Sequence, residues 1–124
     1  MNWFVLATLL AADPRNPYLT QAKVFYQGLE FEKCLKRLDQ AGKWDNAKDQ
    51  LAEIELYQGL CVLPLGKEKD AVEHFELALT IDEALQLPPL QGPKVAALFE
   101  KVKAKVLAAK QKPAPEPVKP EPEP

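Results

Sequence analysis

The chain contains no serine, only one histidine, His74, and two cysteines, Cys34 and Cys61. A Ser–His–Asp triad is therefore excluded, and a Cys–His catalytic pair would have to use that single histidine. The histidine and the cysteines lie too far apart along the sequence for the short ligand spacings of a zinc site. We therefore expect neither catalytic residues nor a metal site, and we predict that the protein is not an enzyme.

Clustered glycines and an excess of positive charge are also missing. The five glycines are dispersed, so no phosphate-binding loop is visible and we expect no cofactor. Lysine and arginine number 16 against 18 acidic residues, a net charge of −2, so nothing attracts the chain to nucleic acid. Its 124 residues, 47% of them apolar and 27% charged, fit a single soluble domain.

Long hydrophobic runs are absent as well. The longest apolar run, Trp3–Ala12, has ten residues, whereas a helix that crosses a bilayer needs about 20, so we expect no membrane span. Its length is typical of the apolar core of a secretory signal, and Ala11 and Ala12 precede a plausible cleavage point. We predict a signal peptide over residues 1–12 and export to the periplasm or cell envelope. The alternative is a cytoplasmic protein in which this segment packs on the first helix.

Proline marks the other end of the domain. Six of the twelve prolines fall in residues 113–124, and this Pro/Glu-rich tail should be extended because proline fixes φ and removes a hydrogen-bond donor. We interpret the tail as a disordered linker or spacer and residues 16–112 as the folded domain.

The domain has helical periodicity throughout and no alternating pattern typical of strands. Gly28 and Gly42 are suited to end the first two helices, Asp45 and Asn46 to cap the third, and Pro93 to begin the last. The predicted helices cover about residues 17–29, 31–42, 47 up to Pro64, 68–82, and 93–112. In the third, the predicted buried stripe consists of Leu51, Ile54, Tyr57, Leu60 and Cys61.

Two helices repeat a small–large–small pattern at a distance of 37 residues: Cys34, Leu38 and Ala41, then Ala71, Phe75 and Ala78. In each case a helix with a small residue comes before, Ala22 in one and Gly59 in the other. Small residues at these positions allow two helices to approach closely, and a period of this length is typical of a helical solenoid.

These residues resemble the tetratricopeptide repeat family over about residues 16–87, with a closing helix after it. The chain departs from the family pattern at Glu83, where a proline is usual, and by three extra residues between the units. The resemblance implies an all-α superhelix of about five helices. It implies that the repeat-packing residues are Ala22, Cys34, Leu38, Ala41, Gly59, Ala71, Phe75 and Ala78.

The same resemblance implies a protein or peptide partner bound in a concave groove. Its groove candidates are Lys23, Tyr26, Gln27, Glu53, Leu56, Tyr57 and Leu60. The chain is also similar to exported repeat proteins of some Gram-negative bacteria. We therefore predict a non-catalytic adaptor, scaffold or assembly factor of a bacterial envelope. The alternatives are a cytoplasmic chaperone of a secreted client and a regulatory subunit of an enzyme.

Three remaining side chains receive simpler interpretations. His74 should be exposed and without a role, because it lies beside the apolar stripe of its helix. Cys34 and Cys61 should be buried thiols, with a disulfide as the alternative if the chain is exported. The sequence leaves the oligomeric state open.

Overall fold

The computed structural model describes residues 16–111, which form five α-helices and no strand. The helices are α2 (Pro17–Gln27), α3 (Phe31–Gly42), α4 (Lys48–Val62), α5 (Glu68–Ile81) and α6 (Pro93–Gln111). The all-α prediction is confirmed for this part of the chain. The predicted signal peptide, residues 1–12, and the tail, residues 113–124, lie outside the described residues. None of the helices described is long and apolar enough to cross a membrane.

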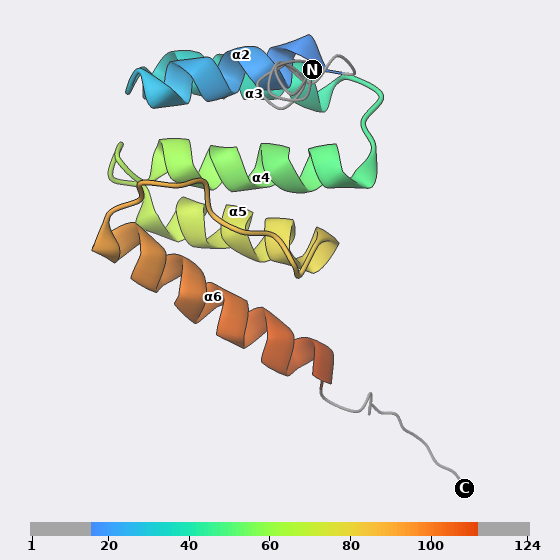
Figure 1. The fold of residues 1–124 in the computed structure, drawn as a ribbon, viewed down its shortest axis with the longest axis vertical. Coiled ribbons are helices and arrows are strands. Elements are labelled where there is room, and N and C mark those ends of the chain that lie inside the picture. Colours follow the sequence, from blue (N-terminus) through green and yellow to red (C-terminus); the bar gives the residue numbers. More distant parts are fainter. Residues whose placement is uncertain (1–15, 112–124) are drawn as a thin grey trace, which may run out of the picture.

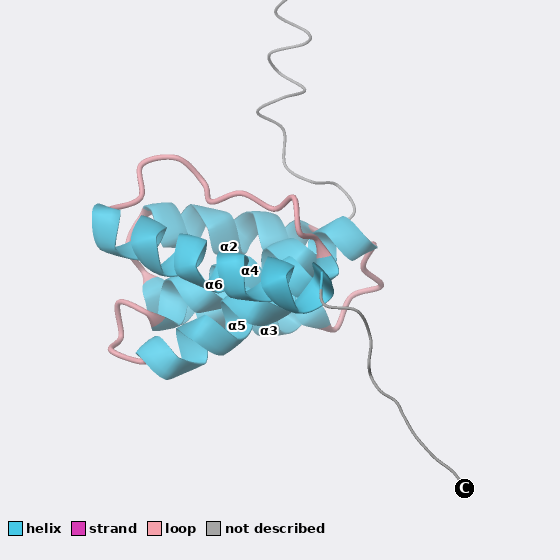
Figure 2. Cartoon of the chain, turned by 90° about the horizontal axis from the view of Figure 1, so that it is seen from below, coloured by secondary structure: helices cyan, strands magenta, loops and turns pink. Residues whose placement is uncertain are grey.

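The helices stack as two antiparallel hairpins followed by a single helix (Figure 1). α2 packs on α3 and α4 packs on α5, while contacts of α3 and α2 with α4 join the hairpins. Seen along the stack, α2, α4 and α6 lie toward one side of the molecule, and α3 and α5 lie toward the other (Figure 2). The eight predicted packing residues are all buried in this arrangement.

Gly59 explains how α4 and α5 approach so closely. A Cβ atom added to this glycine would lie 2.5 Å from Cε1 of Phe75 and 3.2 Å from the carbonyl oxygen of Ala71. The Phe75 ring is completely buried and fills the space that the missing side chain leaves. The small residues on the two helices therefore make room for one large ring between them.

α4 is the central helix, and the predicted one-sided stripe was wrong for it. Nine of its 15 residues are buried, because it packs against both helices of the first hairpin and against α5. Leu51, predicted to be buried, is 41% exposed, whereas Ala52 and Leu56 are buried. Ile54, Tyr57, Leu60 and Cys61 are buried as expected. A helix covered on several sides has no single apolar stripe to read from the sequence.

The start of α4 differs from the prediction in its capping residues. The helix begins at Lys48, and the backbone N–H of Ala47 donates to Oε1 of Gln50 at 2.8 Å. The Asn46 side chain, predicted to cap this helix, instead donates to the carbonyl oxygen of Ala41 at 2.8 Å. The buried Asn16 side chain donates to the same oxygen at 3.2 Å. Asn16, the N-cap residue of α2, therefore fastens the start of α2 to the end of α3, and Asn46 fastens the α3–α4 connection to the same point.

An 11-residue segment, residues 82–92, connects α5 to α6, and we call it the strap. It returns across the molecule in front of α4 and α5, so that α6 begins near the start of α5 and runs in the same direction (Figure 1). In the second view it lies along the side of α2, α4 and α6 (Figure 2). Pro93 is the first residue of α6, as predicted.

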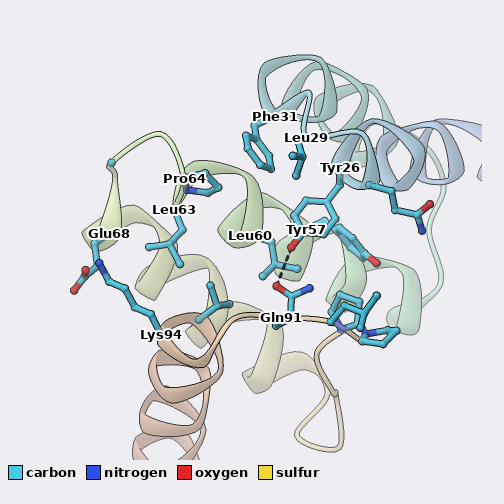
Figure 3. Close-up of a pocket in the computed structure, with 16 residues that line it drawn as sticks. Tyr26, Leu29, Phe31, Tyr57, Leu60, Leu63, Pro64, Glu68, Gln91 and Lys94 are labelled. Carbon is cyan, nitrogen blue, oxygen red and sulfur yellow. Dashed lines mark hydrogen bonds between the residues drawn. The ribbon is translucent and has the colours of Figure 1, made fainter.

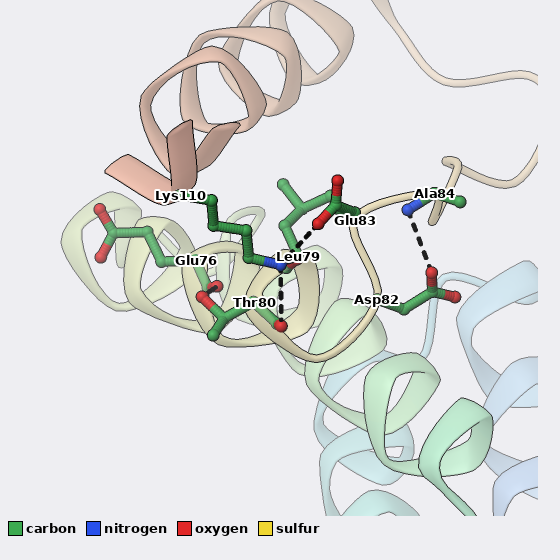
Figure 4. A network of polar contacts seen from close by, with 7 residues as sticks. All are labelled: Glu76, Leu79, Thr80, Asp82, Glu83, Ala84 and Lys110. Carbon is green, nitrogen blue, oxygen red and sulfur yellow. Dashed lines mark hydrogen bonds and ion pairs between the residues drawn. The ribbon is translucent and has the colours of Figure 1, made fainter. Parts of the chain in front are cut away.

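Contacts at two levels hold α6 against α5. The Phe99 ring meets the Phe75 ring edge to face at a centroid distance of 5.6 Å. Farther along, Nζ of Lys110 donates to the carbonyl oxygens of Leu79, at 3.3 Å, and Thr80, at 3.1 Å, and pairs with Glu83 at 3.1 Å (Figure 4). The lysine thus satisfies carbonyl groups at the end of α5, where a helix carries partial negative charge.

Candidate functional site

A mostly apolar hollow of about 910 Å³ lies on one face of the described part of the chain, and we call it the pocket. It lies where the turn of each hairpin and the end of the strap meet, at the ends of α2 and α4 and the start of α6 (Figure 3). Tyr57, Leu60 and Leu63 of α4 and its turn line one part of it, and Tyr26 and Phe31 of the first hairpin line another. Its volume falls within the range of pockets that hold ligands.

Aromatic rings form much of the pocket wall. The rings of Tyr26 and Tyr57 meet edge to face at a centroid distance of 5.4 Å, and Tyr26 is 6.0 Å from the ring of Phe31. The Tyr26 hydroxyl donates to Oε1 of Gln91 at 2.9 Å, which ties α2 to the strap (Figure 3). This wall offers a ligand large apolar faces with few polar groups.

The two tyrosines remain neutral at physiological pH. Burial, followed by the charge of Glu53, raises the pKa of Tyr57 to about 12. Burial also raises the pKa of Tyr26 above its ordinary value of 10.0. A phenol in this state donates hydrogen bonds and does not act as a general base near pH 7.

Two leucines at the pocket have an unusual backbone. Leu29 has a φ of 62° and Leu90 a φ of 68°, and they are the only non-glycine residues with positive φ in the described part of the chain. Leu29 is 72% exposed and Leu90 is 101% exposed, and both line the pocket. The left-handed conformation costs an L-residue about 1–2 kcal/mol. Because the two side chains are so exposed, their burial does little to stabilise the fold. Backbone strain of this kind is concentrated at binding sites.

Two oppositely charged side chains, Glu68 and Lys94, also line the pocket. Glu68 is the first residue of α5, and Lys94 is the second residue of α6 (Figure 3). Both are exposed, and neither forms an ion pair with another residue in the range 16–111. The pocket therefore carries one unpaired charge of each sign and no net charge.

The predicted groove residues fall into three groups. Tyr26, Gln27, Tyr57 and Leu60 come together at the pocket. Lys23 and Glu53 instead pair with each other at 2.9 Å, and Nζ of Lys23 lies 5.7 Å from the centroid of the Tyr57 ring. Leu56 is 2% exposed and belongs to the core.

Sequence reasoning missed Leu29, Leu90 and the strap. Gly28, chosen as the end of the first helix, does cap α2, but its φ is −85° and the next residue takes the left-handed conformation. The 37-residue repeat could have indicated the conformation of Leu29. Gly66 lies 37 residues after it, and glycine is typical of left-handed backbone; the φ of Gly66 is 87°. No comparable pattern marked Leu90.

His74 and the cysteines lie away from the pocket surface. His74 was predicted to be exposed; instead, its side chain is 29% exposed, and its Nδ1 lies 2.8 Å from Oε1 of Glu55, which links α5 to α4. Cys34 and Cys61 are both completely buried as free thiols. A hydrogen bond with Cys34 and burial raise the pKa of the Cys61 thiol, which keeps it protonated. No group of three or more metal-binding side chains occurs in the described region.

Comparisons with protein-family models, with curated proteins and with solved structures give no match. A function for this chain therefore has to be argued from the pocket itself.

Proposed function

We propose that the chain is a non-catalytic protein–protein interaction module that contacts another protein chain at the pocket. The observation that carries this proposal is the pair of exposed leucines, Leu29 and Leu90, both in left-handed backbone and both at the pocket. Neither side chain contributes much buried area to the fold, so contact with another molecule accounts better for their presence. Exposed apolar side chains that gather beside an apolar hollow mark interaction sites on protein surfaces.

The chemistry of the pocket supports binding over catalysis. Its polar groups are two neutral tyrosines, the amides of Gln27 and Gln91, and a single charge of each sign. Since burial raises the pKa values of both tyrosines, neither is a good general base near pH 7. An apolar segment of a partner would be held by ring faces and leucines, with the polar groups setting its orientation.

We also propose that the stacked hairpins form a tetratricopeptide-like superhelix. The support is the distance of 37 residues that relates Ala22 to Gly59 and Cys34 to Ala71, all four of them buried at contacts between helices. This arrangement suits an adaptor or scaffold. Export to a bacterial envelope depends on residues 1–12 and remains a prediction. The intact mass of the protein from fractionated cells tests it, since export would remove about twelve residues.

Site-specific photocrosslinking in cells tests the interaction proposal. A benzophenone amino acid replaces Leu90 or, separately, Leu29, and the control position is Leu77, which is 51% exposed on α5 and does not line the pocket. We expect discrete protein adducts from positions 29 and 90 that weaken when Leu63 is changed to Gln. Adducts no stronger at these positions than at position 77 would contradict the proposal.

A further inference from the structure

The pocket and its exposed leucines lie on one face of one chain, and we infer that the partner that fills the pocket is a second copy of this chain. This inference rests on the proposed function of the pocket and names its partner. Leu90 is fully exposed, and it borders a hollow whose wall includes Leu60 and Leu63. Such a surface pairs with its own copy about a two-fold axis when the projection of each chain enters the hollow of the other.

The backbone holds this projection in place. Leu29 and Leu90 come from the α2–α3 turn and from the strap, two segments far apart in sequence. The hydrogen bond from the Tyr26 hydroxyl to Gln91 fastens the strap one residue after Leu90. Both leucines are therefore presented by segments whose position is already fixed, so docking would order little additional chain.

The charges have the same self-complementarity. Glu68 and Lys94 have no ion-pair partner in the described part of their own chain, and they carry opposite signs at one pocket. In a two-fold dimer, Glu68 of each copy would meet Lys94 of the other, which gives two equivalent ion pairs. A surface with charges of only one sign would repel its own copy.

The pocket is smaller than the contact surface of a stable protein complex. Sixteen residues line it, compared with about 20–30 residues per partner in a stable protein–protein interface. An interface smaller than this standard size is typical of weak, transient association, so we expect a reversible dimer. Such a dimer would be populated at high concentration and would dissociate on dilution.

Sedimentation velocity of the full chain tests this inference directly. Over a range from about 1 μM to about 500 μM, we expect the mass to rise from 13.9 kDa toward twice that value. Leu90→Asn and Leu29→Asn should weaken dimerisation at least tenfold while the variants stay folded, because asparagine tolerates positive φ. Leu77→Gln, the matched control, should dimerise like the unchanged chain.

Exchanging the charges of Glu68 and Lys94 provides a sharper test. If these residues only stabilised the fold of their own chain, mixing the two variants would not restore dimerisation. Glu68→Lys places two lysines at each contact of the two-fold pair, and Lys94→Glu places two glutamates there, so each variant alone should be monomeric. Mixed together, the two variants have opposite charges at both contacts. We expect the mixture to form a heterodimer. A mixture that remains monomeric while the unchanged chain dimerises would overturn the proposed pairing.

The outcomes separate this inference from the proposed function. A chain that stays monomeric at 500 μM, yet gives adducts with a different protein at position 90, overturns the second-copy inference and leaves the interaction module standing. Adducts within one chain, to residues 1–15, would also overturn it, because the occupant would then be the chain's own N-terminal segment. Adducts between two copies, together with the charge exchange, would establish the dimer.

Discussion

The turn of the first hairpin and the turn of the second have the same backbone conformation but different residues. In the first, Leu29 takes the left-handed conformation and its N–H donates to Tyr26 at 3.0 Å. In the second, Gly66 takes it and donates to Leu63, also at 3.0 Å. Each of these helix ends is closed by an additional bond from the following residue, as in the Schellman motif. Glycine is the residue that this motif prefers.

The difference suggests how one repeated element serves two purposes. In the second hairpin, the turn residue is Gly66, which takes the left-handed conformation without strain. The hairpin's largest buried ring, Phe75, lies at the contact between the two helices. The first hairpin has the smaller Leu38 at the equivalent contact and an exposed leucine at the turn. The second hairpin is thus built for stability, whereas the first gives up some stability at a position that faces the pocket.

The largest expected effect comes from emptying the core of the second hairpin. Phe75→Ala removes a fully buried ring that contacts Phe99 at a centroid distance of 5.6 Å, and we predict a loss of about 3–5 kcal/mol in the free energy of unfolding. Leu38→Ala, at the equivalent position, should cost less because fewer atoms are removed. Urea unfolding monitored by circular dichroism measures both. Equal losses would show that the two hairpins contribute equally.

The next effect concerns the close approach of the helices. Gly59→Ala gains about 1 kcal/mol of helix propensity, but its Cβ would lie 2.5 Å from the Phe75 ring, and overpacking costs about 1–3 kcal/mol. We predict that the clash dominates and that the free energy of unfolding falls. In a Phe75→Leu background the same change should be neutral or stabilising. Ala22 occupies the equivalent site in the first hairpin, so Ala22→Gly should destabilise in either background.

Tyr57 makes the stability of the fold depend on pH. Its pKa is about 12 in the folded chain and near 10 when unfolded, so the unfolded state releases the proton first as the pH rises. We therefore predict that its contribution to stability is complete below pH 10 and is lost between about pH 10 and 12. Tyr57→Phe should lack this component. The equivalent residue of the first hairpin, Thr20, does not titrate, and the contribution of Tyr26, which has the same sign, remains in both proteins. Unfolding midpoints of Tyr57→Phe and of the unchanged chain at pH 9 and 11.5 provide the check. If the midpoint fell by the same amount in both proteins between the two pH values, the prediction would be wrong.

The sequence predicted the helices better than it predicted the pocket. Helix positions follow from local periodicity and from residues such as Pro93, whose fixed φ suits the start of a helix. Leu51 was misplaced because α4 is surrounded on several sides, and this depends on how the other helices pack. The strap could not be predicted, since its bond from Tyr26 to Gln91 joins residues 65 positions apart and no local pattern encodes it.

The smallest expected effect tests the comparison of the turns most directly. Leu29→Asn relieves the left-handed strain and removes little buried surface, because the leucine is 72% exposed. We predict a gain of about 1 kcal/mol in the free energy of unfolding, measured by urea denaturation at concentrations where the chain is monomeric. Gly66→Ala introduces the same strain in the second hairpin and should lose a similar amount. If Leu29→Asn instead lowered stability, the leucine side chain would be serving the fold. Its strained backbone would then no longer point to a partner at the pocket.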